Sequence, residues 1–141
     1  MKYKLTDETM TTESGVLLHR IECIDGFGSV KAGDRGGWIE KEENLSQYRN
    51  CWVSGNAKVF GNAVICNSND YIVFKNNWSS GRYFTWTSSN GMWKVGCFYG
   101  TGKDLIEKAY KDSKLSGDCY KAYVELVEKL KELFEKQQQK Q

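Results

Sequence analysis

The sequence predicts a mostly β protein with C-terminal helices: a short β-solenoid with an N-terminal hairpin cap, followed by a three-stranded antiparallel sheet and two helices. Three observations lead to this fold class. Residues 44–65 repeat with a period of six, an Asn-Gly pair at 90–91 separates two strand-like runs, and residues 101–136 carry apolar stripes of helical period. A period of six fits neither a plain strand nor a helix and is typical of a solenoid coil.

The N-terminal segment is predicted to form the cap. Residues 3–6 and 16–24 resemble two strands joined by a polar turn, and such a hairpin would cover the open end of the solenoid. Residues 25–40 follow with five glycines and are expected to form an irregular first coil, which brings Trp38 and Ile39 into the core.

Asparagine marks each unit of the repeat, at positions 44, 50, 56 and 62. Gly55 and Gly61 are expected to form corners, where φ is often positive. The small and branched residues at fixed offsets are predicted to point into a narrow core: Cys51, Val53, Ala57, Val59, Ala63 and Ile65. A β-hairpin with Gly-Asn turns is the alternative for this segment.

Residues 71–75, 82–87 and 92–98 are three β-rich runs. Asn90-Gly91 between the last two is a strong hairpin signal, so these strands are expected to pair antiparallel. The change of pattern near residue 68 divides the chain into two predicted domains, residues 1–68 and 69–141.

Two helices are predicted to complete the second domain. Thr101 is placed to accept a hydrogen bond from a free backbone N–H in the first turn of one helix, which Ser116-Gly117 would end. The other is expected from Asp118 to about Lys136, with an apolar face that must be buried, and the final QQQKQ is expected to fray.

Composition is that of an ordinary globular chain. The 141 residues are 40% hydrophobic and 27% charged, with a net charge of +2 that does not favour binding to a nucleic-acid backbone. Five cysteines without a C-x-x-C pair are expected to be reduced thiols. The N-terminus has no apolar signal region, and a cytoplasmic location is expected.

Several motifs of the N-terminal half match a known family. They are KLTDET at 4–9, HRI at 19–21, FGSVKAGDRGGWIE at 27–40, NLS at 44–46 and WVSGNA at 52–57. These stretches resemble the hexapeptide-repeat β-solenoid proteins of tailed phages and prophages. The run GCFYGT at 96–101 is similar to the start of a small α+β domain often attached to such solenoids.

The resemblance implies a non-enzymatic protein in the cytoplasm of a bacterial host. It points to a steric inhibitor of a bacterial defence complex, such as an anti-CRISPR or other anti-defence protein, with a host protein complex as its partner. A homodimer is plausible, since solenoid edges favour self-pairing. A nucleic-acid-binding accessory protein and a small-molecule sequestering protein are the alternatives.

Residues suited to catalysis are scarce. Hexapeptide solenoids also resemble acyltransferases and γ-carbonic anhydrases, which need histidines as a base or as zinc ligands, and His19 is the one histidine of this sequence. A packing or surface role in the hairpin is expected for it. Cys51 and Cys66 are close enough in the repeat to suggest a metal site, but Cys51 occupies a core position, so no metal, cofactor or catalytic residue is predicted.

Two sets of residues are candidates for contact with a protein partner. An acidic cluster is either a solvated coil edge or a patch that docks on a basic surface: Asp34, Glu40, Glu42 and Glu43. An aromatic and basic set on the predicted sheet is either core or a binding surface that would also stack on bases: Trp78, Arg82, Tyr83, Trp86, Trp93 and Lys94.

Overall fold

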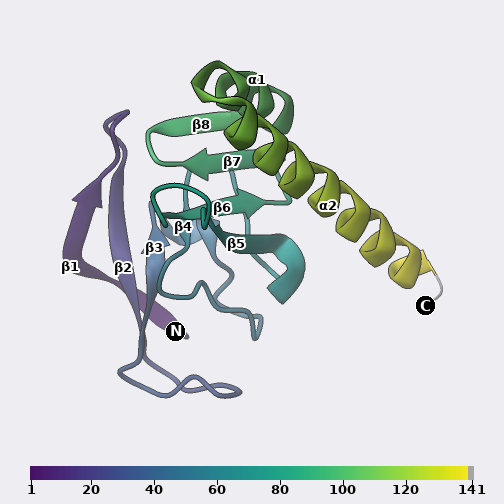
Figure 1. Cartoon of the computed structure of the whole chain (residues 1–141). Coiled ribbons are helices and arrows are strands. Elements are labelled where there is room, and N and C mark those ends of the chain that lie inside the picture. Colours follow the sequence, from purple (N-terminus) through teal and green to yellow (C-terminus); the bar gives the residue numbers. More distant parts are fainter. Residues whose placement is uncertain (140–141) are drawn as a thin grey trace. The chain divides into compact units, whose positions relative to one another are not determined.

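The computed structural model describes residues 1–139 and contains two four-stranded sheets followed by two helices (Figure 1). The strands are β1 (Tyr3–Thr11), β2 (Leu17–Cys23), β3 (Arg35–Ile39), β4 (Lys58–Val59), β5 (Tyr71–Lys75), β6 (Tyr83–Thr87), β7 (Met92–Val95) and β8 (Phe98–Thr101). Short 3-10 turns, η1 (Glu42–Asn44) and η2 (Ser68–Asp70), precede the helices α1 (Gly102–Asp112) and α2 (Lys114–Gln139). A mixed fold with strands first and helices last is therefore confirmed.

By compactness the chain divides into a first unit of residues 1–99 and a second unit that starts at Gly100. Both sheets begin in the first unit. The sequence-based boundary between residues 68 and 69 falls between the two sheets, and an independent domain of residues 1–68 stays a prediction. Among residues 1–139, no helix combines the length and apolarity needed to cross a membrane.

The first sheet has the order β1-β2-β3-β4. β1 and β2 pair antiparallel from Tyr3 with Cys23 to Thr11 with Leu17, which confirms the predicted hairpin. The register shifts between Leu5 and Thr9, so the long β1 curves beside β2 (Figure 1).

From β3 onward the chain runs twice in the same direction, and these two stretches, which we call the two passes, lie side by side. β3 and β4 are parallel, with Trp38 beside Lys58, and a parallel bridge joins Leu45 to Ile65. In each pair the two partners are 20 residues apart in the sequence, whereas one solenoid turn of three six-residue faces would separate them by about eighteen. Residues 1–139 therefore contain no regular hexapeptide solenoid, and the sixfold pattern is not the repeat of the backbone pairing.

The core of the first sheet contains the residues that the repeat predicted to point inward. All six of those residues have exposed fractions of 3% or less. They pack with Tyr3, Ile21, Ile39 and Leu45 in one cluster. Gly61 has φ +65° and forms the predicted corner, while Gly55 does not adopt a positive φ.

The second sheet has the order β5-β6-β7-β8, one strand more than predicted. β6 and β7 pair antiparallel with Trp86 opposite Trp93, and Gly91 in their turn has φ +66°. The Asn-Gly hairpin is thereby confirmed. The fourth strand was missed because residues 98–101 are few and run directly into a helix.

The two sheets contact each other within the first unit. The backbone N–H of Lys58 donates to the Thr85 hydroxyl at 3.2 Å, and the Tyr71 hydroxyl donates to the carbonyl of Trp52 at 2.7 Å. These contacts place the outward side chains of β4 close to the strands β6 and β7.

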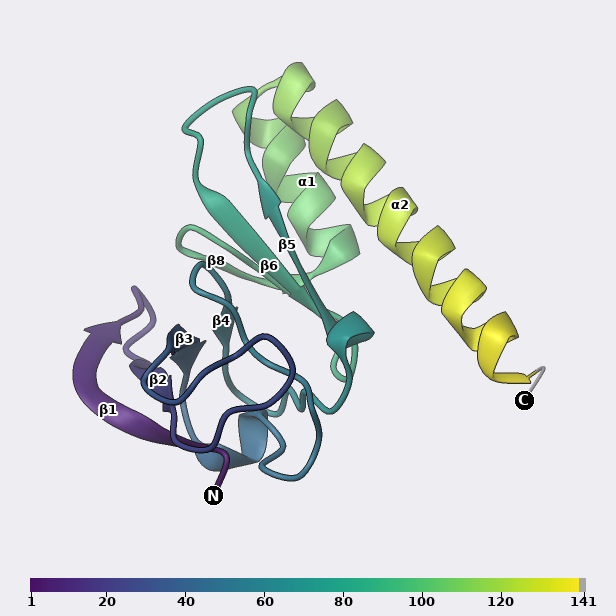
Figure 2. The same ribbon diagram turned by 90° about the horizontal axis from the view of Figure 1, so that it is seen from below.

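The second unit is a pair of helices, with α1 alongside the first half of the much longer α2 (Figure 2). The Thr101 hydroxyl accepts from the N–H of Asp104 at 3.2 Å, as predicted. The predicted break at Ser116-Gly117 is wrong, because α1 already ends at Asp112 and α2 begins at Lys114. α2 continues to Gln139, and the last residues of the QQQKQ segment lie outside the described part.

Candidate functional site: a basic cleft

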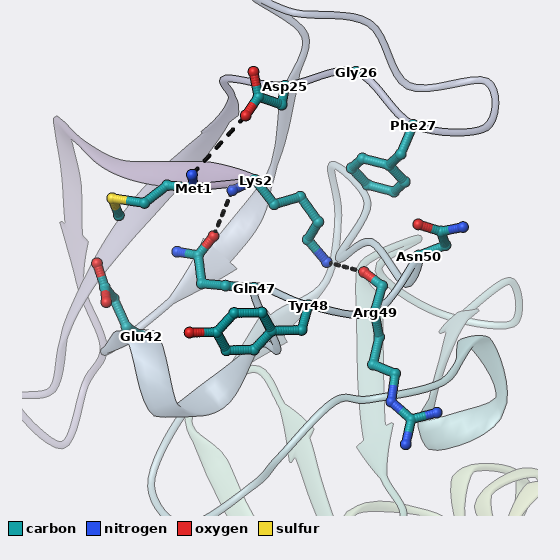
Figure 3. A pocket seen from close by; sticks show the side chains of 10 residues that line it. All are labelled: Met1, Lys2, Asp25, Gly26, Phe27, Glu42, Gln47, Tyr48, Arg49 and Asn50. Atoms are coloured by element: carbon teal, nitrogen blue, oxygen red, sulfur yellow. Dashed lines mark hydrogen bonds and ion pairs between the residues drawn. The ribbon is translucent and has the colours of Figure 1, made fainter.

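A first cavity of about 500 Å³ lies beside the start of β1 (Figure 3). Its central group is the Lys2 ammonium, which donates to the carbonyls of Arg49 at 2.7 Å and Cys51 at 2.6 Å. The same nitrogen lies 4.9 Å from the centre of the Phe27 ring. Burial lowers the pKa of Lys2. Because this ammonium already donates hydrogen bonds to backbone carbonyls, we interpret Lys2 as a structural link between the start of β1 and residues 49–51.

A second cavity of about 520 Å³, which we call the basic cleft, lies between the two sheets of the first unit. It is built from the β1–β2 turn, from β2, β3 and β4, and from the start of β6 and the β7–β8 turn. Its lining residues are Glu13, Arg20, Trp38, Gly55, Asn56, Lys58, Arg82, Tyr83 and Gly96.

Strand alternation explains how Lys58 lines this cleft and how Lys94 comes to lie close to it. Val59 is fully buried in the core of the first sheet, so the neighbouring Lys58 side chain points to the other face of β4. On β7, Trp93 is 2% exposed, and Lys94 projects from the opposite face, across from Thr85. The contact between β4 and β6 therefore brings both lysines to the same region.

Positive charge is concentrated there. Burial lowers the pKa of Lys58, and the nearby positive charges of Lys94 and Arg82 lower it further, while Glu13 acts in the opposite direction. Lys94 itself is only 6% exposed and donates to the Glu13 carboxylate at 3.2 Å and to the Gly96 carbonyl. Lys94 forms the ion pair with Glu13, and Lys58 and Arg82 add further positive charge nearby, so the cleft is suited to an anion.

Arg20 forms one wall of the cleft. Its guanidinium lies 4.7 Å from the centre of the Trp38 ring, and its Nε is 3.2 Å from the carboxylate of Glu8. Glu8 also pairs with Arg35. Because Glu8 offsets part of the charge of Arg20 and its guanidinium lies over the Trp38 ring, Arg20 contributes a flat wall to the cleft.

The aromatic and basic set predicted from the sequence is divided by the structure. Arg82 and Tyr83 line the basic cleft, with Tyr83 49% exposed, and the nearly buried Lys94 forms an ion pair with the cleft residue Glu13. Trp86 and Trp93 are buried, with ring centres 6.4 Å apart. Trp78 is half-buried, with its ring centre 6.5 Å from that of Phe84.

The acidic cluster does not converge on the cleft. Asp34 is exposed and accepts from the N–H of Lys31 at 2.9 Å, which closes a turn. Glu40 is half-buried and accepts from the N–H of Gly61 at 2.9 Å. Glu42 and Glu43 are exposed on η1.

Three charged residues of the cleft were not singled out by the sequence: Glu13, Arg20 and Lys58. Trp38 was expected in the core, but it is half-buried and lines the cleft. Lys58 occupies an outward position of the repeat, which was the available signal, but nothing in the pattern indicates that β6 and β7 lie opposite it. His19 is on the other face of β2 from Arg20, and its Nδ1 lies 3.1 Å from the Thr6 carbonyl oxygen.

The five cysteines are free thiols, as expected. Within residues 1–139, no group of three or more His, Cys, Asp and Glu side chains is placed to hold a metal ion. The thiols nearest the first cavity are buried, and burial raises the pKa of both Cys23 and Cys51.

Comparison with known proteins reveals one informative similarity. No protein-family model matches the sequence. The chain is 43% identical over 72 residues to an uncharacterized acetyltransferase, YdcK, of Escherichia coli strain K12. The match covers 45% of this chain and 22% of that protein, so the chain spans about a fifth of the relative's length.

This similarity corrects the functional expectations drawn from the sequence. The resemblance to phage and prophage solenoid proteins, the anti-CRISPR-like role and the non-enzymatic assignment are wrong, because the relative found is a bacterial acetyltransferase. The reason is that the expected role came from the resemblance of the scaffold motifs and from the scarcity of histidine, and neither of these observations identifies a ligand.

Proposed function

We propose that this chain has an acetyltransferase-related function and that its basic cleft binds the phosphate groups of an acetyl donor such as acetyl-coenzyme A. The proposal is supported by the similarity to an acetyltransferase and by the chemistry of the cleft. The observation that carries it is that Lys58 and Arg82 line the cleft close to Lys94, whose ion-pair partner is the exposed Glu13 carboxylate.

Crowded cations favour a bound anion for a simple reason. Burial is the main cause of the lowered pKa of Lys58, and the positive charges of Lys94 and Arg82 lower this pKa further. An anion placed among these cations removes their mutual repulsion. Lysine and arginine are the side chains that commonly bind phosphate, arginine through two parallel hydrogen bonds. Coenzyme A is a group carrier whose phosphates provide such an anchor.

The walls of the cleft add apolar and aromatic surface to this charge. The Trp38 indole is covered on one face by Arg20, and the Tyr83 ring is half exposed at the rim. A flat ring at the rim is suited to stack on a nucleotide base. Because the match covers 22% of the acetyltransferase, the proposal is confined to donor binding and assigns no catalytic base.

The chain path over residues 36–65 is part of this proposal. We propose that residues 36–65 are a minimal parallel winding of two passes with a 20-residue offset, supported by the pairing of Trp38 with Lys58 and of Leu45 with Ile65. The winding matters for function because it places Lys58 beside the wall formed by Trp38.

Isothermal titration calorimetry with three ligands tests the function. Acetyl-coenzyme A and coenzyme A carry the phosphates, whereas pantetheine lacks the phosphates together with the adenosine. We expect the first two to bind with similar affinity and pantetheine to bind at least about tenfold more weakly, since it forms no charge-assisted hydrogen bonds with the cations. Equal binding of pantetheine and coenzyme A, or no binding of any of the three, would refute the proposal.

A further inference from the structure

We propose that Glu13 is a tethered competitor for the basic cleft, which makes the cleft select ligands with two or more negative charges over single anions. This inference rests on the proposed function, because it concerns the same cations. It assigns a role to a residue of the β1–β2 turn that neither the sequence pattern nor the similarity to an acetyltransferase indicates.

The β1–β2 turn holds Glu13 in place. Thr12, which is 5% exposed, accepts from the N–H of Gly15 at 2.9 Å through its carbonyl and from the N–H of Val16 at 3.0 Å through its hydroxyl. Gly15 has φ +92°, a conformation that favours glycine. A turn tied in this way presents the Glu13 side chain at a defined position.

From that turn the carboxylate reaches a lysine 81 residues later in the chain. Glu13 Oε2 accepts from Lys94 Nζ at 3.2 Å, while 60% of the Glu13 side chain remains exposed and only 6% of Lys94 does. A hydrogen bond from the backbone of Glu13 itself, and then Lys94, hold the pKa of the Glu13 carboxyl below its usual value. The carboxylate is therefore charged at neutral pH and occupies the position where a ligand's anionic group would meet Lys94.

The asymmetry in burial indicates which partner moves. Lys94 is nearly buried and has the Gly96 carbonyl as a second acceptor, so it stays in place when a ligand arrives. Glu13 is mostly exposed and loses little contact with the protein by turning to solvent. Displacement of Glu13 by a ligand therefore requires no rearrangement of either sheet.

Competition of this kind favours polyanions. A tethered carboxylate has a high effective concentration at Lys94, so a single anion such as acetate only exchanges one unit charge for another. A ligand with adjacent phosphates replaces the Glu13 charge at Lys94 and also reaches Lys58 and Arg82, both of which act on the same space. The additional ion pairs of such a ligand outweigh the loss of the ion pair between Glu13 and Lys94.

Titration of the full chain with inorganic pyrophosphate, inorganic phosphate and sodium acetate tests this inference. The variants are Glu13→Gln, which removes the charge, and Glu13→Asp, which keeps the charge on a side chain one methylene too short to reach Lys94. We expect both variants to bind pyrophosphate about two- to fivefold more tightly than the unaltered chain, since the competing carboxylate of Glu13 is mostly exposed and such an ion pair is weak. We also expect the ratio of the pyrophosphate affinity to the acetate affinity to be smaller in both variants than in the unaltered chain.

The outcomes separate this inference from the proposed function. If the unaltered chain binds pyrophosphate and Glu13→Gln binds it equally or more weakly, Glu13 is no competitor, although donor binding stands. If Glu13→Asp binds pyrophosphate like the unaltered chain while Glu13→Gln binds it more tightly, the negative charge at position 13 acts at long range. Displacement of Glu13 by the ligand is then refuted. If no form binds pyrophosphate, the proposed function fails together with the inference. Thermal unfolding of each variant verifies that it is folded.

Discussion

The side-chain amide of Asn44 donates a hydrogen bond of 2.8 Å to the carbonyl of Ala63, 19 residues further along the chain. The same nitrogen donates to Gly61 at 3.2 Å, and the amide oxygen accepts from the N–H groups of Glu40 and Lys41. Asn44 is completely buried. One side chain thus joins the two passes that support Lys58 and the wall of the cleft.

Asn44→Ala is expected to lower the free energy of unfolding by about 2–3 kcal/mol, because it leaves buried backbone groups without partners. Asn50→Ala is the matched control: Asn50 has the same position in the sixfold repeat but is exposed, so a change within about 0.5 kcal/mol is expected. Urea unfolding followed by circular dichroism measures both. Similar losses for the two variants would contradict the special role of Asn44.

Gly37→Ala tests the close approach of the two passes. A Cβ at Gly37 would lie 2.3 Å from the Ser54 carbonyl oxygen and 2.8 Å from that of Ala57, so the backbones would have to separate. We expect a loss of about 2 kcal/mol or more in the free energy of unfolding. Gly55→Ala is the control, because that position has open space and no positive φ, and a gain of about 0.4–1 kcal/mol is expected there.

Gly117 explains why the helix boundary was misplaced. It lies inside α2, and a Cβ there would be 2.1 Å from the Tyr110 ring, which packs against the helix from α1. Gly117→Ala is expected to destabilise the chain although alanine favours a helix by about 1 kcal/mol. In a Tyr110→Ala background the same change should stabilise by about that amount. A destabilising Gly117→Ala in both backgrounds would show that the ring is not the cause.

The cleft cations are expected to control donor affinity. Arg82→Ala and Lys58→Ala should each weaken coenzyme A binding about tenfold or more, with a smaller effect at high salt where charges are screened. Lys31→Ala removes an equal charge from an exposed residue outside the cleft lining and should leave the affinity unchanged. Calorimetry at low and high ionic strength measures this, and equal losses for Lys31→Ala would indicate non-specific attraction.

Burial of Lys58 predicts a pH dependence with a definite sign. Its pKa is lowered in the folded chain, so between that lowered value and the ordinary 10.5 the unfolded chain binds more protons. The free energy of unfolding of the unaltered chain, relative to Lys58→Met, should therefore rise as the pH approaches 10.5. Titrating groups that do not interact with Lys58 cancel in this difference. Urea unfolding of both proteins at neutral and alkaline pH measures this difference in the free energy of unfolding. If the difference stays constant or falls as the pH rises, the pKa of Lys58 is not lowered in the folded chain.

Local patterns predicted local structure well. The small and branched residues of the repeat are buried, Asn90-Gly91 forms its hairpin and Thr101 caps its helix. Each of these features depends on neighbours within a few residues, whose backbone preferences and burial are encoded in the sequence at that point. The end of α1 was missed because a glycine signals both a helix end and a tight helix contact.

The cleft could not be predicted, because its parts come from distant segments. Arg82 and Tyr83 were candidates for contact with a protein partner and lie in the cleft lining. The sequence gives no sign that Glu13 and Lys58 lie close to Lys94. That meeting depends on the 20-residue offset between the passes and on the contact of β4 with β6.

By itself the sequence determined which residues are buried in the first sheet and where the main hairpins and helices form, since hydrophobic period and turn chemistry act locally. Only the tertiary structure decided which charges meet. Like charges repel and do not drive folding, so Lys58, Lys94 and Arg82 are brought together by the packing of apolar faces behind them, and that arrangement leaves no periodic signal in the chain.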